Sequence, residues 1–231
     1  MDYSYIDKNA ARIREELCAA AEAAGRSPSD VTLLAAVKYA DADEINYLCH
    51  SCGVLDIGEN RVQQLLEHWD AIDREGVRFH FIGSLQTNKV KYIVDKVCMI
   101  HSVDSEKLAA EIDKRARAVG RVIDVLVEIN SGREENKSGV MPEDAAELCE
   151  KLAKYPNIRL CGFMTMAPRC ENSEEYRKYF SETYDLIIDI WEKKLHNIKR
   201  AIISMGMSES FHEAVAAGST CVRVGRAFFA K

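Results

Sequence analysis

The sequence predicts an α/β protein whose single domain, residues 1–231, is a closed (β/α)8 barrel, also called a TIM barrel. Three observations support this prediction. Short apolar runs alternate with helical patterns along the chain, eight such runs can be distinguished, and no polar linker or low-complexity stretch interrupts them. Strict alternation favours parallel strands joined by right-handed crossovers. An open doubly wound sheet is the alternative, but the Gly-x-Gly-x-x-Gly turn of a dinucleotide-binding fold is missing after the first predicted strand.

The predicted elements can be assigned in order from the N-terminus. Ile6, Ile13 and Leu17 recur at helical intervals before Gly25, so we expect residues 5–24 to form an amphipathic helix. The apolar runs predict strands over residues 31–37, 54–57, 79–82, 97–101, 123–129, 158–163, 201–204 and 220–224. The amphipathic segments between them predict helices over residues 43–52, 61–73, 105–118, 142–153, 174–195 and 209–217.

The two ends of the chain are expected to meet on one side of the barrel. Only a few residues separate the last predicted strand from Lys231, so we expect no helix after that strand. We expect the N-terminal helix, within residues 1–25, to pack on the barrel and cover that side instead.

The composition is that of an ordinary globular protein. With 231 residues, 47% of them hydrophobic, the chain is long enough to bury a large core. Its formal charge of −6 provides no basic field, so we expect no nucleic-acid partner. No apolar run is long enough to cross a bilayer, and residues 1–8 lack the layout of a secretory signal. We therefore expect a cytoplasmic protein, a monomer, whose eight cysteines are reduced thiols.

Lys38 is the candidate nucleophile. It closes the apolar run Val31-Thr-Leu-Leu-Ala-Ala-Val37, so the first predicted strand delivers one amine to its C-terminal end. Barrel enzymes hold their chemistry at that end. An amine attacks an aldehyde only in its neutral form, which desolvation at the barrel mouth favours. A lysine at a strand end is more often a solvated surface charge, so the assignment depends on what surrounds Lys38.

Two segments near the end of the chain have the composition of anion-binding turns. In Ser204-Met-Gly-Met-Ser208, two hydroxyls flank Gly206, which lets the backbone approach an anion. In Val222-Arg-Val-Gly-Arg226, Gly225 frees a second set of amides. Barrels commonly bind phosphate at the loops after strands seven and eight, and the two segments lie at the ends of the seventh and eighth predicted strands. An amine facing a phosphate site suits pyridoxal 5'-phosphate, whose aldehyde bonds to a lysine.

Three further polar residues lie in or after predicted strands. Arg223 alternates with Val222 and Val224, so its guanidinium is expected at the barrel top or interior, where it needs an anionic or ring-nitrogen partner. Asn60 follows the second strand and either caps the next helix or faces the cofactor. His80 lies inside the third strand and is expected to be a packing residue with its hydrogen bonds satisfied.

We predict no metal site. Cys49-His-Ser-Cys52 has the spacing of a redox or metal-binding pair. However, no second cysteine pair or closely spaced histidine set supplies the remaining ligands, and the segment falls within a predicted helix.

Several motifs, taken together, resemble the pyridoxal phosphate homeostasis protein family. The match covers nearly the whole chain, and the motifs keep the family order without a large insertion. The resemblance implies a single-domain barrel like the N-terminal domain of alanine racemase, and a cofactor carrier without established turnover. The motifs are Leu34-Ala-Ala-Val-Lys38, Gly58-Glu-Asn-Arg-Val-Gln63, His80-Phe-Ile-Gly-Ser-Leu-Gln-Thr-Asn-Lys89, Asn136-Lys-Ser-Gly139, Gly162-Phe-Met164, Ser204-Met-Gly-Met-Ser208 and Ala217-Gly-Ser-Thr-Cys-Val-Arg-Val-Gly225.

The resemblance also implies roles for individual residues. Lys38 is similar to the family's Schiff-base lysine, and Arg223 to an arginine that meets either the pyridine nitrogen or the phosphate. Asn60 is a further cofactor neighbour. The family often has Ser or Thr beside the lysine and a second lysine two residues later, where this chain has Val37, Tyr39 and Ala40. The residues similar to phosphate neighbours are Ser204, Gly206, Met207, Ser208, Gly225 and Arg226.

Two functions are compatible with these residues. The first is a carrier in vitamin B6 homeostasis that holds pyridoxal 5'-phosphate on Lys38 and yields it to other proteins, including apoenzymes that depend on it. We then assign no catalytic residue. The second is an amino-acid racemase, which needs a second acid/base on the opposite face of the cofactor. In similar racemases an additional C-terminal domain supplies that group, and we expect none here because the chain ends at Lys231. A sugar-phosphate enzyme lacks an evident acid/base pair, so the carrier is favoured.

Overall fold

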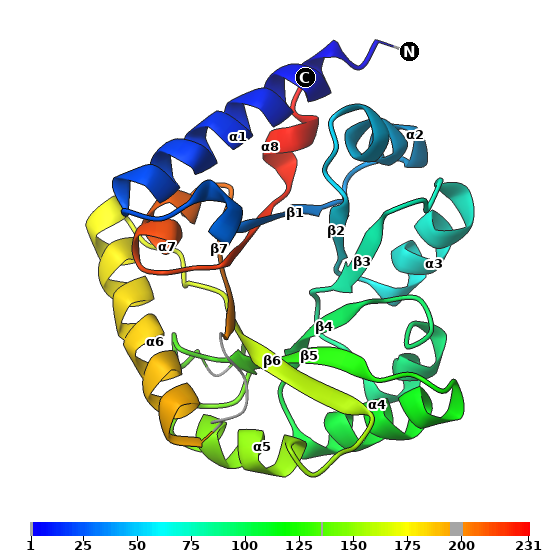
Figure 1. Cartoon of the computed structure of the whole chain (residues 1–231), viewed down its shortest axis with the longest axis vertical. Helices are drawn as coiled ribbons and strands as arrows, with labels where there is room; N and C mark the ends of the chain where they lie inside the picture. Colours follow the sequence, from blue (N-terminus) through cyan, green and yellow to red (C-terminus); the bar gives the residue numbers. More distant parts are fainter. Residues whose placement is uncertain (1, 135, 195–200) are drawn as a thin grey trace.

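Eight parallel strands pair in the order of the chain, and the first pairs with the last, so that they close into a barrel (Figure 1). The computed structural model describes residues 2–134, 136–194 and 201–231. The single-domain (β/α)8 barrel expected from the sequence is confirmed. Its strands are β1 (Thr32–Ala36), β2 (Asp56–Glu59), β3 (Arg78–Phe81), β4 (Met99–Val103), β5 (Ile123–Ile129), β6 (Ile158–Thr165), β7 (Ile202–Met207) and β8 (Cys221–Val224).

Helices surround the barrel (Figure 1). Among the described residues, no helix combines the length and the apolar character needed to cross a membrane. The α-helices are α1 (Ser4–Ala23), α2 (Ala42–Asn46), α3 (Val62–Ala71), α4 (Glu106–Ala118), α5 (Ala145–Leu152), α6 (Ser173–Lys194), α7 (Phe211–Ala216) and α8 (Arg226–Phe229). Shorter helical segments are η1 (Pro28–Asp30), η3 (Thr87–Tyr92) and η4 (Pro142–Asp144), with a π-helical turn, η2 (Tyr47–Ser51), after α2.

Side chains alternate between the barrel interior and the layer beneath the helices. In β1, Leu34 and Ala36 pack inside the barrel, whereas Ala35 and Val37 join the larger core under the helices. This alternation is the two-residue period of a strand that is buried on both faces. Other apolar residues of the interior clusters are Ile82, Cys221, Met99, Leu126 and Met164.

The predicted elements agree with the structure except for some boundaries. β2 begins at Asp56 and not at residue 54, and it extends to Glu59, which is fully buried and hydrogen-bonded. The predicted helix over residues 43–52 is the α2 and η2 pair. The predicted helix over residues 174–195 is α6, and residue 195 lies outside the described residues.

A one-turn helix, α8, follows the last strand, so the expectation of no helix there was wrong. It forms because Phe228 is fully buried in the core. Nδ2 of Asn9 in α1 donates hydrogen bonds to the carbonyl oxygens of Phe228 (3.1 Å) and Ala230 (2.8 Å). α1 lies beside α8 at the edge where both chain ends are found (Figure 1). The N-terminal helix therefore packs on this side of the barrel, as predicted.

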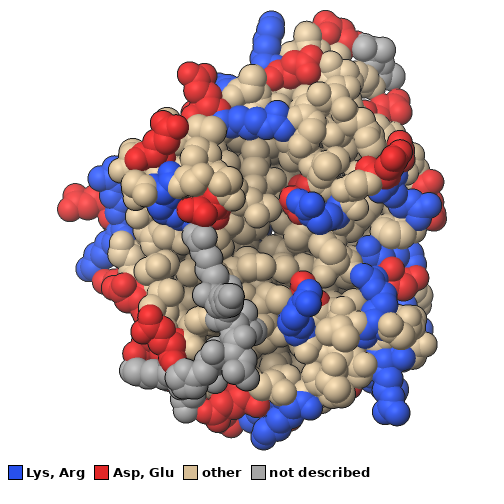
Figure 2. Space-filling model, viewed as in Figure 1, with Lys and Arg blue, Asp and Glu red and all other residues tan. Residues whose placement is uncertain are grey.

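The face of the molecule seen in Figure 1 carries charges of both signs. Lys and Arg side chains are interspersed with Asp and Glu around its rim, and its centre is mostly uncharged (Figure 2). The visible part of this face thus lacks the continuous basic surface that holds a nucleic-acid backbone. This agrees with the formal charge of −6.

Gly162 marks an irregularity in the pairing of β5 with β6. The register shifts between Val125, which pairs with Leu160, and Leu126, which pairs with Gly162. Gly162 has a φ of +151°, and a Cβ atom there would lie 2.0 Å from the carbonyl oxygen of Ile202 on β7. β6 and β7 approach each other at this point because residue 162 has no side chain.

We predict that Gly162→Ala destabilises the barrel by about 3 kcal/mol or more, because the added methyl group overlaps the backbone of β7. Gly120→Ala is the matched control. Gly120 also has a positive φ, +66°, but a Cβ atom there has no neighbour within 4 Å, so this change should cost only backbone strain of about 1–2 kcal/mol. Urea unfolding of both variants measures the difference, and equal losses would contradict the role of the overlap.

Candidate functional site

Lys38 lies in a turn at the C-terminal end of β1, and hydrogen bonds hold the backbone of this turn. The N–H of Val37 donates to the carbonyl oxygen of Gly58 (3.1 Å), and the N–H of Ala40 donates to that of Val37 (2.9 Å). Nε2 of Gln64 in α3 donates to the carbonyl oxygen of Lys38 itself (3.0 Å). The turn is therefore tied to β2 and to α3.

The side chain of Lys38 is half-buried at the barrel mouth. Leu34 and Ala36 face the barrel interior, and the same alternation continued by one step directs Lys38 inward. Its Nζ lies 5.1 Å from the centroid of the Tyr39 ring, which is within the range of a cation–π contact. Tyr39 is 63% exposed, so one side of the amine faces an open edge of the protein.

The loops after β7 and β8 are joined to each other beside the end of β1. The N–H of Gly225 donates to Oγ of Ser208 (3.2 Å). Because this hydroxyl accepts here, it retains its own proton to donate. A Cβ atom on Gly225 would lie 3.3 Å from the carbonyl oxygen of Ala36 in β1, so the two backbones are close. The predicted anion-binding segments therefore lie next to the strand that carries Lys38.

β7 extends to Met207, beyond the predicted end at residue 204, and its last residues turn closely over α7. Gly206 has a φ of +93°, and a Cβ atom there would lie 2.5 Å from the Cβ atom of Ala214. The N–H of Met207 donates to Oγ of Ser210 (3.3 Å), while the Met207 side chain is 39% exposed. The turn thus requires glycine at position 206 and is fixed by a hydroxyl.

Arg223 points into the barrel interior, as its place in β8 predicts. The residue is 5% exposed. Its Nη1 donates to the carbonyl oxygen and to Oγ of Ser204, both at 2.7 Å, and its Nη2 donates to the carbonyl oxygen of Thr165 (2.9 Å). Burial lowers the pKa of Arg223, an effect that Cys221 and Glu128 partly oppose. These three acceptors are neutral oxygens, so none of them neutralises the guanidinium.

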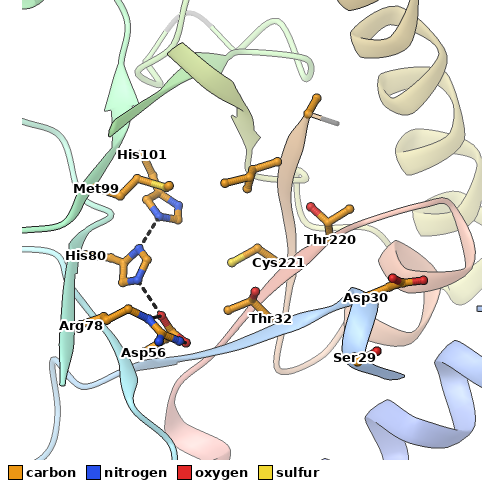
Figure 3. A pocket seen from close by; sticks show the side chains of 12 residues that line it. Ser29, Asp30, Thr32, Asp56, Arg78, His80, Met99, His101, Thr220 and Cys221 are labelled. Carbon is orange, nitrogen blue, oxygen red and sulfur yellow. Dashed lines mark hydrogen bonds and ion pairs between the residues drawn. The ribbon is translucent and has the colours of Figure 1, made fainter. Parts of the chain in front are cut away.

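Ser204 lies inside the barrel, where a hydrogen-bonded row of side chains begins. Ser204 is fully buried, and its Oγ lies 3.1 Å from Nδ1 of His101. Nε2 of His101 lies 3.0 Å from Nδ1 of His80, whose Nε2 lies 2.9 Å from Oδ1 of Asp56 (Figure 3). His80 is therefore a buried histidine with both ring nitrogens hydrogen-bonded, as predicted from the sequence.

Buried polar atoms without a hydrogen-bond partner gather near the C-terminal ends of the strands. Among the described residues they include Oδ1 of Asn60 after β2, Oγ of Ser102 in β4 and Oε2 of Glu128 in β5. Glu128 is 3% exposed; burial raises its pKa, and its Oε1 accepts a hydrogen bond from Ser138 (2.9 Å). Unpaired buried polar atoms are rare, and they indicate a place where a ligand or an ordered water binds.

Sequence reasoning missed Glu128 and Ser102 as candidates. The signal for Glu128 was available, because it is a carboxylate within the apolar strand over residues 123–129. It lies two residues after Leu126, so strand alternation directs both side chains to the barrel interior. Ser102 gave no such signal. Of the residues that were singled out, Asn60 also lines a cavity of about 590 Å³ with Ser84 and Gln86, and Arg226 is exposed at the start of α8.

A buried ion pair lies beneath the turn that carries Lys38. Glu59 at the end of β2 is fully buried, and its Oε1 lies 2.5 Å from Nδ1 of His68 in α3. This hydrogen bond is the main cause that raises the pKa of His68, and the carbonyl oxygen of Ala40 contributes in the same direction. His68 therefore connects the end of β2 with the turn of Lys38.

Comparison with known proteins gives matches over almost the whole chain. The family described as alanine racemase, N-terminal domain, matches residues 7–230. A pyridoxal phosphate homeostasis protein of Aquifex aeolicus is 42% identical and covers 94% of each chain. A crystal structure of an unknown protein from Bifidobacterium adolescentis has a TM-score of 0.87 at 35% identity, with 99% of this chain and 97% of that one covered. PipY of Synechococcus elongatus, solved with PLP bound, has a TM-score of 0.79 at 28% identity, with 94% and 99% covered.

The Glu59–His68 pair predicts how stability changes with pH. Because the pKa of His68 is raised in the folded state, the pair stabilises the fold fully below the unfolded-state pKa of about 6.5, and this contribution is lost as pH rises through the folded-state pKa. We expect the difference in unfolding free energy between wild type and His68→Gln to shrink as pH rises above about 6.5. Denaturant unfolding at a series of pH values measures it, and a difference independent of pH would contradict the pairing.

Proposed function

The chain belongs to the alanine racemase N-terminal domain family and, within it, to the pyridoxal phosphate homeostasis proteins, and on this basis we propose that it binds pyridoxal 5'-phosphate as a carrier. The bound cofactor supplies an aldehyde that bonds to primary amines and a ring that withdraws electrons from them. The proposed role is vitamin B6 homeostasis in the cytoplasm: a monomer holds the cofactor and releases it to apoenzymes that need it.

One observation carries this proposal. The half-buried amine of Lys38 and the hydroxyl of Ser208 lie at the same end of the barrel, after β1 and β7. They are linked through β8, which pairs with both strands: Gly225 after β8 approaches Ala36 in β1 and donates to Ser208. An amine for the aldehyde and hydrogen-bond donors for the phosphate are the two groups that pyridoxal 5'-phosphate requires from a protein. The unpaired atoms of Asn60, Ser102 and Glu128 at the same end fit a polar ligand.

Lys38 is the residue that we propose forms the Schiff base with the cofactor. Three hydrogen bonds hold the turn, one of them to the carbonyl oxygen of Lys38 itself, so the side chain extends from a fixed backbone. Release then requires hydrolysis or replacement of Lys38 by an incoming amine. Ala40 stands where the family often has a second lysine, so release by replacement of Lys38 would use an amine from outside this turn.

We assign the phosphate to the loops after β7 and β8. Ser208 would donate through the hydroxyl proton that it retains while accepting from Gly225. The N–H groups of Met207 and Gly225 themselves donate to Ser210 and Ser208, so these two amides act by holding the hydroxyls. Arg223 and Ser204 lie deeper, and Asn60 follows β2. Gly206 permits the tight backbone at the end of β7, and Arg226, which is exposed, begins α8 directly after Gly225.

A carrier is favoured over a racemase by the chemistry of the residues in the site. Racemisation needs a second group that exchanges a proton with the substrate on the far side of the cofactor. Arg223 is a guanidinium, which donates hydrogen bonds and does not accept a proton. If it faces the ring nitrogen, it disfavours protonation there and weakens the electron-withdrawing ring. The relative from Aquifex aeolicus is also named for homeostasis and not for a reaction.

We expect the protein with its cofactor to be yellow, and borohydride to fix the cofactor to Lys38, which peptide mass spectrometry would detect. Lys38→Ala should lose the visible absorbance and weaken retention about tenfold or more, a change of about 1.4 kcal/mol or more. Lys89→Ala, which removes a lysine from the cavity beside Asn60, is the matched control and should keep the absorbance. Label on another lysine would overturn the assignment.

Incubation of the loaded protein with L-alanine or L-serine should give no D-isomer faster than free cofactor does, because a proton-exchanging partner on the second face is required for turnover. Chiral chromatography of the amino acid over time measures this. Sustained turnover by wild type that disappears in Lys38→Ala would instead make the protein a racemase.

A further inference from the structure

A row of hydrogen bonds runs through the barrel from its N-terminal mouth to Arg223. It joins five side chains on five strands: Asp56 of β2, His80 of β3, His101 of β4, Ser204 of β7 and Arg223 of β8. We refer to these five residues as the interior relay. Figure 3 shows its first three members lined up along one wall of a cavity. The relay is buried, because each member is 8% exposed or less.

With the His80 ring neutral, the Asp56 end of the relay sets the proton positions on both histidines. Burial alone would raise the pKa of Asp56, but hydrogen bonds from His80 and Arg78 lower it to about 2, so its carboxylate only accepts. Nε2 of His80 must then carry a proton and donate to Asp56. In a neutral ring this leaves Nδ1 of His80 as an acceptor, so Nε2 of His101 carries a proton and donates to it.

The same logic continues to Arg223. Burial, together with the nearby charge of Arg223, lowers the pKa of His101 well below its usual value, so its ring is neutral. Nδ1 of His101 is therefore an acceptor, and the hydroxyl of Ser204 donates to it (3.1 Å). Having used its proton, Oγ of Ser204 presents lone pairs to Nη1 of Arg223 (2.7 Å). Every donor in the relay thus points from Arg223 toward Asp56.

The direction of these hydrogen bonds matters because few acceptors hold the guanidinium of Arg223. Its hydrogen-bond acceptors are two carbonyl oxygens and the hydroxyl of Ser204. If His101 carried its proton on Nδ1, it would donate to Ser204 and occupy one of the two lone pairs of Oγ, and the hydroxyl proton would lose its acceptor in the relay. An unpaired buried donor is costly. The relay therefore supplies the acceptor that orients the hydroxyl proton away from Arg223 and leaves the lone pairs of Ser204 to the guanidinium.

We propose that Asp56, His80 and His101 are positioning residues that hold Arg223 in place for the cofactor by fixing Ser204 as a hydrogen-bond acceptor. The proposal rests on the proposed function of the barrel. None of the three needs to touch the cofactor, because each acts through its neighbour in the relay. Asp56 is the first residue of β2, at the barrel end opposite Lys38, so a change there tests action through the relay.

The Asp56 end of the relay can be changed by mutation without touching the residues proposed to contact the cofactor. Asp56, His80 and His101 line a cavity of about 330 Å³ together with residues that begin other strands, among them Thr32 and Cys221 (Figure 3). Arg78 pairs with Asp56 at the rim of this cavity. A substitution of Asp56 therefore alters a wall of the N-terminal mouth and leaves the loops after β7 and β8 unchanged.

The test compares Asp56→Asn with Asp124→Asn. An amide both donates and accepts, so Asn at position 56 no longer imposes one proton position on His80. Asp124 offers a matched control, because it also begins a strand region and pairs with an arginine of the next strand: Nε of Arg159 lies 2.6 Å from its Oδ1. The two carboxylates occupy equivalent places, and only Asp56 is hydrogen-bonded to the histidines.

Two measurements are made on each protein. Nitrogen-15 spectra of the cofactor-free protein should show His80 and His101 in the Nε2–H form in wild type and Asp124→Asn, and a mixture of forms in Asp56→Asn. Titration with pyridoxal 5'-phosphate should show affinity reduced about threefold to tenfold in Asp56→Asn, as expected for one weakened hydrogen bond, and within about twofold of wild type in Asp124→Asn.

The outcomes separate this inference from the proposed function. Wild-type histidines in the Nδ1–H form, unchanged affinity in Asp56→Asn, or equal losses in both variants would each overturn the positioning role. Wild type that binds no cofactor would overturn the proposed function, and the spectra of the cofactor-free protein would still decide whether the relay has the stated direction.

Discussion

The pairing of β1 with β8 is the constraint on which the whole site depends. In this register Leu34 lies opposite Arg223 and Ala35 opposite Val224, so Gly225 comes beside Ala36 and the turn of Lys38 follows directly. An amine from the first strand and the hydroxyl-rich turns of the last two strands thereby share one mouth. No local preference of these segments could bring them together; only closure of the barrel does, because closure makes the first and last strands neighbours.

The barrel interior combines two kinds of packing. Part of it is filled by apolar side chains such as Met99, Leu126 and Met164, as in most barrels of this type. The interior relay occupies another part, and there the polar side chains are tolerated because each of them has a hydrogen-bond partner. At the C-terminal mouth this matching stops, and Ser102 and Glu128 keep atoms without partners. These unpaired atoms lie at the mouth of the barrel, where a ligand could supply the missing hydrogen-bond partners.

Sequence patterns predicted the eight strands because each is a short apolar run between turn signals, and β5 was placed correctly at both ends. β2 was misplaced because Val54 and Leu55, although apolar, precede the strand, whereas the buried Glu59 belongs to it. α8 was missed because its formation depends on contacts with α1, which is distant in the sequence. Period-two alternation predicted that Arg223 faces inward. It could not predict that Arg223 meets Ser204, or that His80 meets His101, since those contacts depend on the relative register of different strands.

The contact between α1 and α8 has a consequence for how the protein is made. Residues that the site needs are spread from β1 to β8, and Asn9 near the start of the chain holds the backbone of Phe228 and Ala230 near its end. While the chain emerges from the ribosome, the early strands have no β8 to pair with, and the nascent mouth lacks Arg223 and Gly225. The candidate site is therefore assembled only after β8 has been synthesised, and a chain truncated before β8 carries Lys38 without Arg223 and Gly225.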